Sequence, residues 1–145
     1  MNKNFRIKNY ETGISWQRTV AEIEELLVAI GAEAILKDYY GDGRIAALSF
    51  KYQKRGYRLP ANSVKVAELL KSYPGFKRAM QQHREEQAER IAWRNIRDWF
   101  EAQVALIQTS QVEVAQIMLP YMWDGRETLY EKLKDRQFML EPGSD

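Results

Sequence analysis

Residues 34–52, AILKDYYGDGRIAALSFKY, contain two runs of strand-forming residues on either side of Gly41-Asp42-Gly43. Glycine and aspartate accept the positive φ angles of a tight hairpin turn, and the flanking runs have the composition of strands. We therefore expect strands over Ala34–Tyr40 and Arg44–Tyr52, joined by a turn at the three central residues. This hairpin makes an antiparallel sheet the starting point of the fold.

The segment before the hairpin predicts a helix. Apolar residues recur every three or four positions over Trp16–Ile30, with acidic residues on the opposite side. Ser15 offers a side-chain oxygen as N-cap, and Gly31 is placed to end the helix. Further upstream, Phe5–Tyr10 alternates loosely and predicts a short edge strand.

The segment after the hairpin predicts one more strand and a second helix. A turn around Lys54-Arg55-Gly56 leads to a strand over Tyr57–Leu59, which Pro60 closes. A helix capped by Asn62 or Ser63 then runs over residues 64–72 and stops at Pro74-Gly75. The sheet is therefore expected to have three to four antiparallel strands.

The remaining half of the chain predicts only helices. No Gly or Pro occurs between about Phe76 and Thr109, which favours one rod of roughly 50 Å, and two short helices follow over Gln111–Met122 and Glu127–Lys134. We expect a single α+β domain over residues 1–145, with a mixed part at 1–75, a helical part at 76–138 and a frayed tail at 139–145.

Composition excludes several classes of protein. The 145 residues are 45% hydrophobic and 29% charged, with Trp 4, Tyr 8 and Phe 5, which excludes disorder throughout. Charged residues interrupt every apolar run long before the length of a membrane span. The chain has no cysteine and no apolar signal-peptide segment at its start, so we expect a cytoplasmic protein without disulfides or thiolate metal sites.

Catalytic residues are scarce, so we expect neither an enzyme nor a cofactor. The one histidine, His83, lies in a polar stretch and is interpreted as part of a solvated helix face. Asp98 and Glu101 could ligate a metal ion, but Arg94 and Arg97 precede them by four residues each. Ion pairing is favoured over a metal site, and a metal-dependent nuclease is the third functional hypothesis.

Charge is sorted along the chain although the net charge is only +2. Residues 1–36 sum to −1, residues 37–97 to +8 and residues 98–145 to −5. Such a chain could present an electropositive face to phosphate groups, or folding could interleave the charges into a mixed surface.

An arginine stripe in the long helix is the first candidate binding site. Arg90, Arg94 and Arg97 are spaced to share one side of the helix next to Trp93, where guanidinium groups could bind phosphate and the indole could stack on a base. The alternative is an ordinary salt-bridged helix whose carboxylates are supplied by Glu86, Asp98 and Glu101.

The basic hairpin over residues 50–58 is the second candidate site. Lys54, Arg55 and Arg58 alternate with Tyr57 and other aromatic residues, a composition that suits single-stranded nucleic acid. The alternative is that the rings pack in the core and the cations protect an exposed sheet edge.

The helical half also carries candidate residues for a homo-oligomer interface, because a small sheet could not cover all of its apolar surface. These residues are Trp99, Phe100, Val104, Ile107, Met118 and Trp123.

The element order expected over residues 16–73, a helix, three strands and a helix, is similar to that of a double-stranded-RNA-binding domain. The second helix of that domain begins with several basic residues, and of these the present sequence has only Lys65. Element order without this motif is weak support, because a fold does not confer a function.

Short motifs extend over about residues 10–122: Tyr10-Glu11-Thr12, Thr19-Val20-Ala21-Glu22-Ile23, Gly31-Ala32, Arg58-Leu59-Pro60, Ala92-Trp93-Arg94, Asp98-Trp99, Glu101-Ala102-Gln103 and Leu119-Pro120-Tyr121. With these motifs the chain resembles a family of small phage and prophage proteins that have no established activity. The resemblance implies a viral accessory protein expressed inside bacteria. Such proteins commonly bind host nucleases, nucleic acid or nucleotide signals of bacterial immunity. Under this resemblance, the candidate binding residues are a polar cluster of Arg58, Arg90, Trp93, Arg94 and Asp98.

Together these observations predict a non-enzymatic binding protein of phage type with a phosphate-rich ligand, a nucleotide or a nucleic acid. The alternative is a protein-directed inhibitor or assembly module that contacts a host protein through its acidic C-terminal part.

Overall fold

A three-stranded antiparallel sheet lies at the centre of the computed structural model, which describes residues 6–139, 141 and 143. The strands β1 (Ala34–Tyr39), β2 (Ile45–Tyr52) and β3 (Arg55–Pro60) follow one another in space as they do in the chain. The sheet and the long helix described below confirm the predicted α+β class.

The first helix is confirmed at both ends. Helix α1 covers Trp16–Ile30, and Ser15 Oγ accepts a hydrogen bond from the backbone N–H of Arg18 at 3.2 Å. Gly31 ends the helix with φ 95°, a conformation that costs little only without a Cβ atom. The predicted strand at Phe5–Tyr10 is wrong for residues 6–10, where the chain turns instead, and Phe5 lies outside the described residues.

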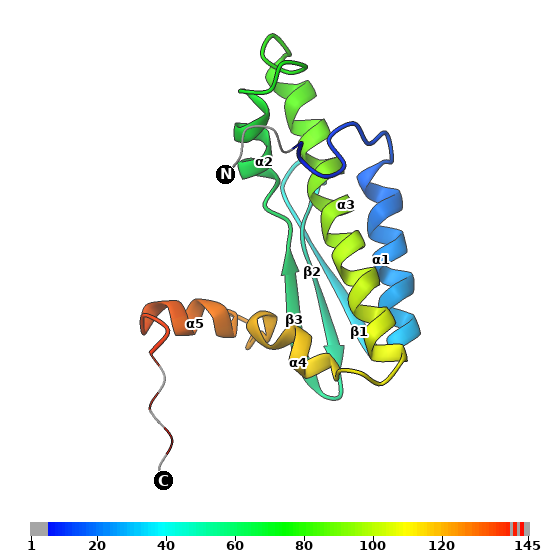
Figure 1. Ribbon diagram of the computed structural model, residues 1–145, viewed down its shortest axis with the longest axis vertical. Coiled ribbons are helices and arrows are strands. Elements are labelled where there is room, and N and C mark those ends of the chain that lie inside the picture. The colour runs from blue at the N-terminus through cyan, green and yellow to red at the C-terminus, as the bar shows by residue number, and fades with distance from the viewer. Residues whose placement is uncertain (1–5, 140, 142, 144–145) are drawn as a thin grey trace.

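The long helix α3 covers Gln81–Gln108, so it begins five residues later than predicted. It follows α2 (Ser63–Leu70) and a series of turns in which Phe76 is buried against Leu70, Ala88 and Ile91. Its 28 residues span about 42 Å. Figure 1 shows α1 beside α3 along the sheet and α2 near the start of α3. Both α1 and α2 pack against α3.

The main core joins the sheet to α1, α3 and the segment after α3. Phe50 of β2 pairs with Tyr57 of β3, and these side chains pack in one cluster with Trp93 and Phe100 of α3 and with Leu27 of α1. Tyr57, Trp93 and Phe100 are each at most 1% exposed. No helix of the described residues has the length and apolar character needed to cross a membrane.

The C-terminal helices are shorter than predicted, although the one beyond Glu127 lies close to its expected place. Helix α4 covers Val114–Met118, a 3-10 turn η1 covers Leu119–Tyr121, and α5 covers Leu129–Asp135. In α5, Thr128 and Glu131 form a capping box. Figure 1 shows α5 extending away from the sheet. Of the tail that was expected to fray, residues 140, 142, 144 and 145 lie outside the described part of the chain.

Candidate functional site

The tip of the β2–β3 hairpin exposes a group of cations. Gln53 and Lys54 form a two-residue turn with φ 47° and 66°, and Tyr52 pairs with Arg55 as the last pair of the ladder. Two consecutive positive φ angles match the twist of the flanking strands. The turn therefore lies one to two residues earlier than predicted, and β3 begins at Arg55.

The cations at this tip have no acidic partner among the described residues. Lys51, Lys54 and Arg55 are exposed, and none of them takes part in the ion pairs formed within residues 6–139, 141 and 143. Glu33 lies near the tip, but its Oε1 accepts the backbone N–H of Lys54 at 3.3 Å. The tip thus keeps three positive charges that form no ion pair with any side chain in the described part of the chain.

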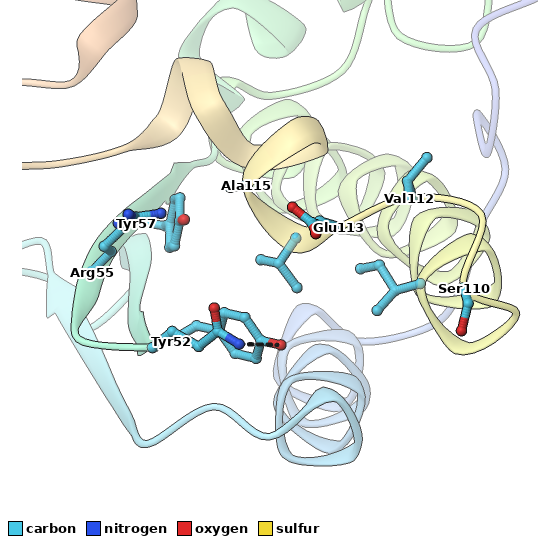
Figure 2. Close-up of a pocket in the computed structure, with 10 residues that line it drawn as sticks. Tyr52, Arg55, Tyr57, Ser110, Val112, Glu113 and Ala115 are labelled. Carbon is cyan, nitrogen blue, oxygen red and sulfur yellow. Dashed lines mark hydrogen bonds between the residues drawn. The ribbon is translucent and has the colours of Figure 1, made fainter.

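A hollow of about 420 Å³ opens beside the tip, between the hairpin and the loop from α3 to α4. Figure 2 shows Tyr52, Arg55 and Tyr57 on the hairpin side and Glu113 on the other. Apolar and polar side chains both line it, and the polar ones are Gln53, Arg55, Ser110 and Glu113. The apolar wall residues are Tyr52, Tyr57, Ile107, Val112, Val114 and Ala115.

The far wall of this hollow is fixed by a helix cap. The Glu113 carboxylate accepts a backbone N–H of the first turn of α4, and the Glu113 N–H donates to Gln116 Oε1 at 2.7 Å. Val114, the first residue of α4, is 2% exposed. The cap holds the Glu113 carboxylate in α4 rather than in an ion pair with Arg55.

A second hollow of about 310 Å³ lies beside the tip, and its lining residues are Lys54, Arg55, Gly56, Met122, Trp123, Asp124, Leu129 and Lys132. Here the chain after η1 runs along β3, and the Trp123 N–H donates to Gly56 O at 2.9 Å. Asp124 and Lys132 form an ion pair at 2.7 Å. The hydrogen bond from Lys132, helped by two backbone N–H groups, holds the pKa of Asp124 well below its usual range.

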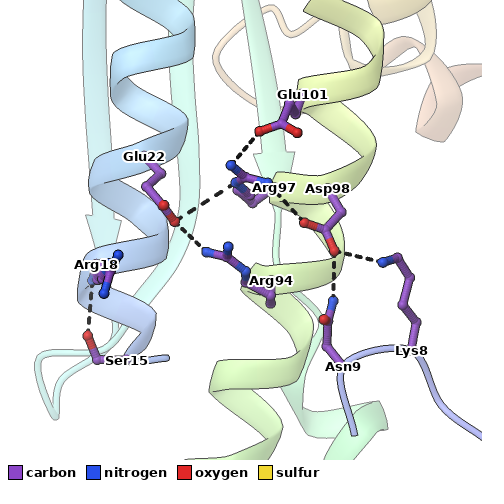
Figure 3. A network of polar contacts seen from close by, with 9 residues as sticks. All are labelled: Lys8, Asn9, Ser15, Arg18, Glu22, Arg94, Arg97, Asp98 and Glu101. Atoms are coloured by element: carbon purple, nitrogen blue, oxygen red, sulfur yellow. Dashed lines mark hydrogen bonds and ion pairs between the residues drawn. The ribbon is translucent and has the colours of Figure 1, made fainter. Parts of the chain in front are cut away.

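Two arginines of the stripe, Arg94 and Arg97, form ion pairs within α3 and between α3 and α1, and Figure 3 shows this network. Arg94 pairs with Glu22 of α1, so the predicted pairing of Arg94 with Asp98 is wrong. Arg97 pairs with Glu101, as predicted, and also with Asp98 at 3.2 Å. The Arg94 and Arg97 side chains are only 14% and 20% exposed.

Asp98 completes this network on its other side. Its Oδ2 accepts hydrogen bonds from Lys8 Nζ at 2.8 Å and from Asn9 Nδ2 at 2.9 Å. Burial alone would raise the pKa of Asp98, but the hydrogen bonds from Asn9, Lys8 and Arg97 outweigh it and lower the pKa to about 2. Asp98 therefore ties the N-terminal segment to α3.

The polar cluster selected by the resemblance does not form. Trp93 is fully buried in the core, where its ring cannot stack on a ligand. Arg58 lies on the opposite face of the sheet from the core residues Tyr57 and Leu59, paired with Asp38 and 5.3 Å from the Trp123 ring.

The other members of the stripe and hairpin also differ from the predictions. Arg90 donates to Gln87 Oε1 at 3.1 Å rather than pairing with Glu86. Tyr57 stacks on Phe50 inside the core, with ring centroids 5.2 Å apart, and is not available to a ligand. Of the predicted binding residues, only Lys54 and Arg55 are both exposed and without an acidic partner in the described part of the chain.

The residues predicted for an oligomer interface lie mostly inside the protein. Phe100, Val104 and Met118 are at most 2% exposed and belong to the core. Trp99 and Ile107 are half-buried and pack against that core. Trp123 is half-buried as well and lies under the Arg58 guanidinium. Three of the six residues are therefore closed to a partner subunit, and the other three are only partly exposed.

Sequence reasoning missed a buried carboxylate, Glu89, which is 1% exposed. The signal was present, because Glu89 shares a helix face with Trp93 four residues later. His83, by contrast, is exposed as predicted and stacks on Phe76 with ring centroids 5.4 Å apart.

The described residues hold no group of three or more His, Asp or Glu side chains arranged to bind a metal ion. Comparisons with protein-family models, with curated proteins and with solved structures find no match to this chain.

Proposed function

We propose that this protein is a non-enzymatic binding protein whose ligand is phosphate-rich, and that the β2–β3 hairpin tip binds it. The observation that carries the proposal is the group of three exposed cations, Lys51, Lys54 and Arg55, without acidic partners in the described part of the chain. When unpaired cations of a protein bind phosphates, they displace the counterions condensed on the nucleic acid, and the release of those counterions drives binding.

The neighbouring hollow favours single-stranded nucleic acid among phosphate-rich ligands. Its volume of about 420 Å³ is enough for a base, and Tyr52 offers part of a ring on the same side as Arg55. A strand could place its phosphates on the tip while one base enters between the hairpin and the α3–α4 loop. The arginine stripe has no part in this proposal, because Arg94 and Arg97 already pair with carboxylates and Arg90 is only partly exposed.

The biological setting belongs to the same proposal and rests on the resemblance to phage and prophage proteins. In that setting the protein acts in the cytoplasm of an infected bacterium, where it covers nucleic acid or a nucleotide signal and so counters a host defence.

The test is a titration of a fluorescent single-stranded oligonucleotide, followed by anisotropy at several salt concentrations. The double variant Lys54→Asn with Arg55→Gln removes two positive charges. Asparagine is chosen at position 54 because it tolerates the positive φ angle of this turn residue. We expect about a tenfold weaker affinity and a log–log salt slope reduced by about 1.4.

The matched control is Lys65→Gln with Lys77→Gln, which removes two exposed cations elsewhere and leaves the same net charge. We expect the control to keep the affinity of the unmodified protein. Equal losses in both double variants would show that net charge alone drives binding and would refute the hairpin site.

The competing function is a protein-directed inhibitor or assembly module, and the shape of the C-terminal part supports it. Helix α5 has no buried residue, and Tyr130 and Phe138 are each about half exposed, with ring centroids 5.5 Å apart. The same titration separates the two functions, because folded protein that binds no oligonucleotide would favour this alternative.

A further inference from the structure

The two hollows beside the hairpin tip share a wall residue. Arg55, the first residue of β3, lines both the hollow of about 420 Å³ and the hollow of about 310 Å³. The first hollow extends toward the loop from α3 to α4, and the second extends toward the segment that follows η1. A ligand that occupies both hollows therefore meets the exposed guanidinium group of Arg55 between them.

The far wall of the second hollow is a turn that is fixed to β3. The Leu129 N–H donates to Met122 O at 2.8 Å, and the Trp123 N–H donates to Gly56 O at 2.9 Å. Gly56 permits this close approach, because a Cβ atom at its position would lie only 3.1 Å from Trp123 O. The wall is therefore formed by the chain itself, and a ligand need not order it.

The charge of the second hollow is positive. Asp124 is its one carboxylate among the lining residues, and it pairs with Lys132 at 2.7 Å. The same carboxylate accepts two backbone N–H groups of its own turn, at 2.9 Å each. Lys54 and Arg55 form no ion pair in the described part of the chain, so their charges remain available to a phosphate.

Each hollow also has an aromatic residue beside its cations. Half-buried Tyr52 lines the first hollow, and half-buried Trp123 lines the second. Figure 2 shows Tyr52 and Arg55 together at the end of the hairpin. An aromatic ring next to a cation is the combination that binds a base together with its phosphate, whatever the base. Two such cavities, with one guanidinium group between them, match two successive nucleotides.

We infer that the hairpin site binds two successive nucleotides of a single strand, with one base in each hollow and the connecting phosphate on Arg55. A guanidinium group can donate two parallel hydrogen bonds to the oxygens of one phosphodiester. The inference rests on the proposed function and adds the size of the unit that is bound. It requires that the two bases be neighbours, whereas binding through charge alone is indifferent to which nucleotides carry bases.

The experiment is a competition between a fluorescent single-stranded oligonucleotide and three tetranucleotides, each with three phosphodiesters. The first has four thymines, the second has thymine only at its two central positions, and the third has thymine only at its two ends. The other positions are abasic. The second should compete within about threefold of the first. The third should compete at least about fivefold more weakly than the second, because only one of its bases stacks at a time.

Two variants test the hollows separately. Trp123→Leu removes the ring of the second hollow and Tyr52→Leu removes that of the first, while all charges stay in place. Each should reduce the difference between the second and third tetranucleotides to less than about twofold and leave the salt slope unchanged. Either variant serves alone if the other does not fold. The matched control Tyr39→Leu alters a tyrosine of β1 that is 61% exposed, and it should keep the full difference.

The outcomes separate this inference from the proposed function. Equal competition by the second and third tetranucleotides overturns the inference, and so does a second tetranucleotide that fails to compete. The proposed function survives both results if Lys54→Asn with Arg55→Gln still weakens binding of the fluorescent oligonucleotide. Ring variants that keep the full difference also overturn the inference. A folded chain that does not bind the fluorescent oligonucleotide at all overturns both.

Discussion

Replacing Arg94 by alanine distinguishes a structural arginine stripe from a ligand-binding one. Arg94 joins α3 to α1 through Glu22, and the two side chains are 14% and 26% exposed. Exposed ion pairs contribute at most about 1 kcal/mol, whereas loss of one partner from a buried pair costs about 3–5 kcal/mol. This partly buried pair lies between those limits, so we expect a loss of about 2 kcal/mol in the free energy of unfolding.

Urea denaturation at pH 7 measures this loss. With a slope of about 2 kcal/mol per M for a chain of this size, the midpoint should fall by about 1 M. The matched control is Arg78→Ala, because Arg78 is exposed and forms no ion pair among the described residues, and we expect a change within about 0.5 kcal/mol. Oligonucleotide affinity should be unchanged in Arg94→Ala.

A double-mutant cycle with Glu22→Gln assigns the effect to the pair rather than to lost packing of the Arg94 stem. We expect a coupling energy above about 0.5 kcal/mol. The reasoning is refuted if Arg94→Ala keeps its midpoint but loses the oligonucleotide, since the stripe would then be a binding surface.

Two further predictions concern Asp98, which ties the N-terminal segment to α3, and Phe100, which lies in the core. The lowered pKa of Asp98, about 2 against a usual 3.8, means that its carboxylate stabilises the fold above about pH 4 and that this stabilisation is lost as the pH falls toward 2. Asp98→Asn should therefore cost about 2 kcal/mol at pH 7 and only about 0.4 kcal/mol near pH 2 in urea denaturation, whereas Glu25→Gln, an exposed site, should leave both values unchanged. Phe100→Ala should cost about 3–5 kcal/mol by the same assay and leave the mass in light scattering unchanged, because Phe100 is fully buried within the chain. A lower mass with unaltered stability would contradict that placement.

The sequence determined the elements whose signals are local. Ser15 and Gly31 bracket α1 because a capping hydroxyl and a residue able to adopt positive φ act within one turn of the helix. The β1–β2 hairpin formed for the same reason, since its turn residues accept the conformations that a tight turn requires.

Sequence patterns that extend over several helical turns predicted the ends of the elements less accurately. The absence of Gly and Pro after residue 75 predicted a helix from Phe76, yet residues 71–80 turn so that Phe76 is buried against Leu70 and Ile91. Burial of a large apolar side chain outweighs the small helix propensity of a few residues.

Only the tertiary structure decided which charges are free and which rings are available. Arg94 and Glu22 are 72 residues apart in the chain, and Lys8 and Asp98 are 90 apart, so no helical spacing could indicate these pairs. The hairpin cations form no ion pair with the described residues, and two acidic side chains close to the hairpin accept backbone N–H groups instead, Glu113 in the cap of α4 and Glu33 from Lys54. Periodicity places a side chain on a face of its own element, but whether that face meets a carboxylate, an apolar core or water depends on how the elements pack.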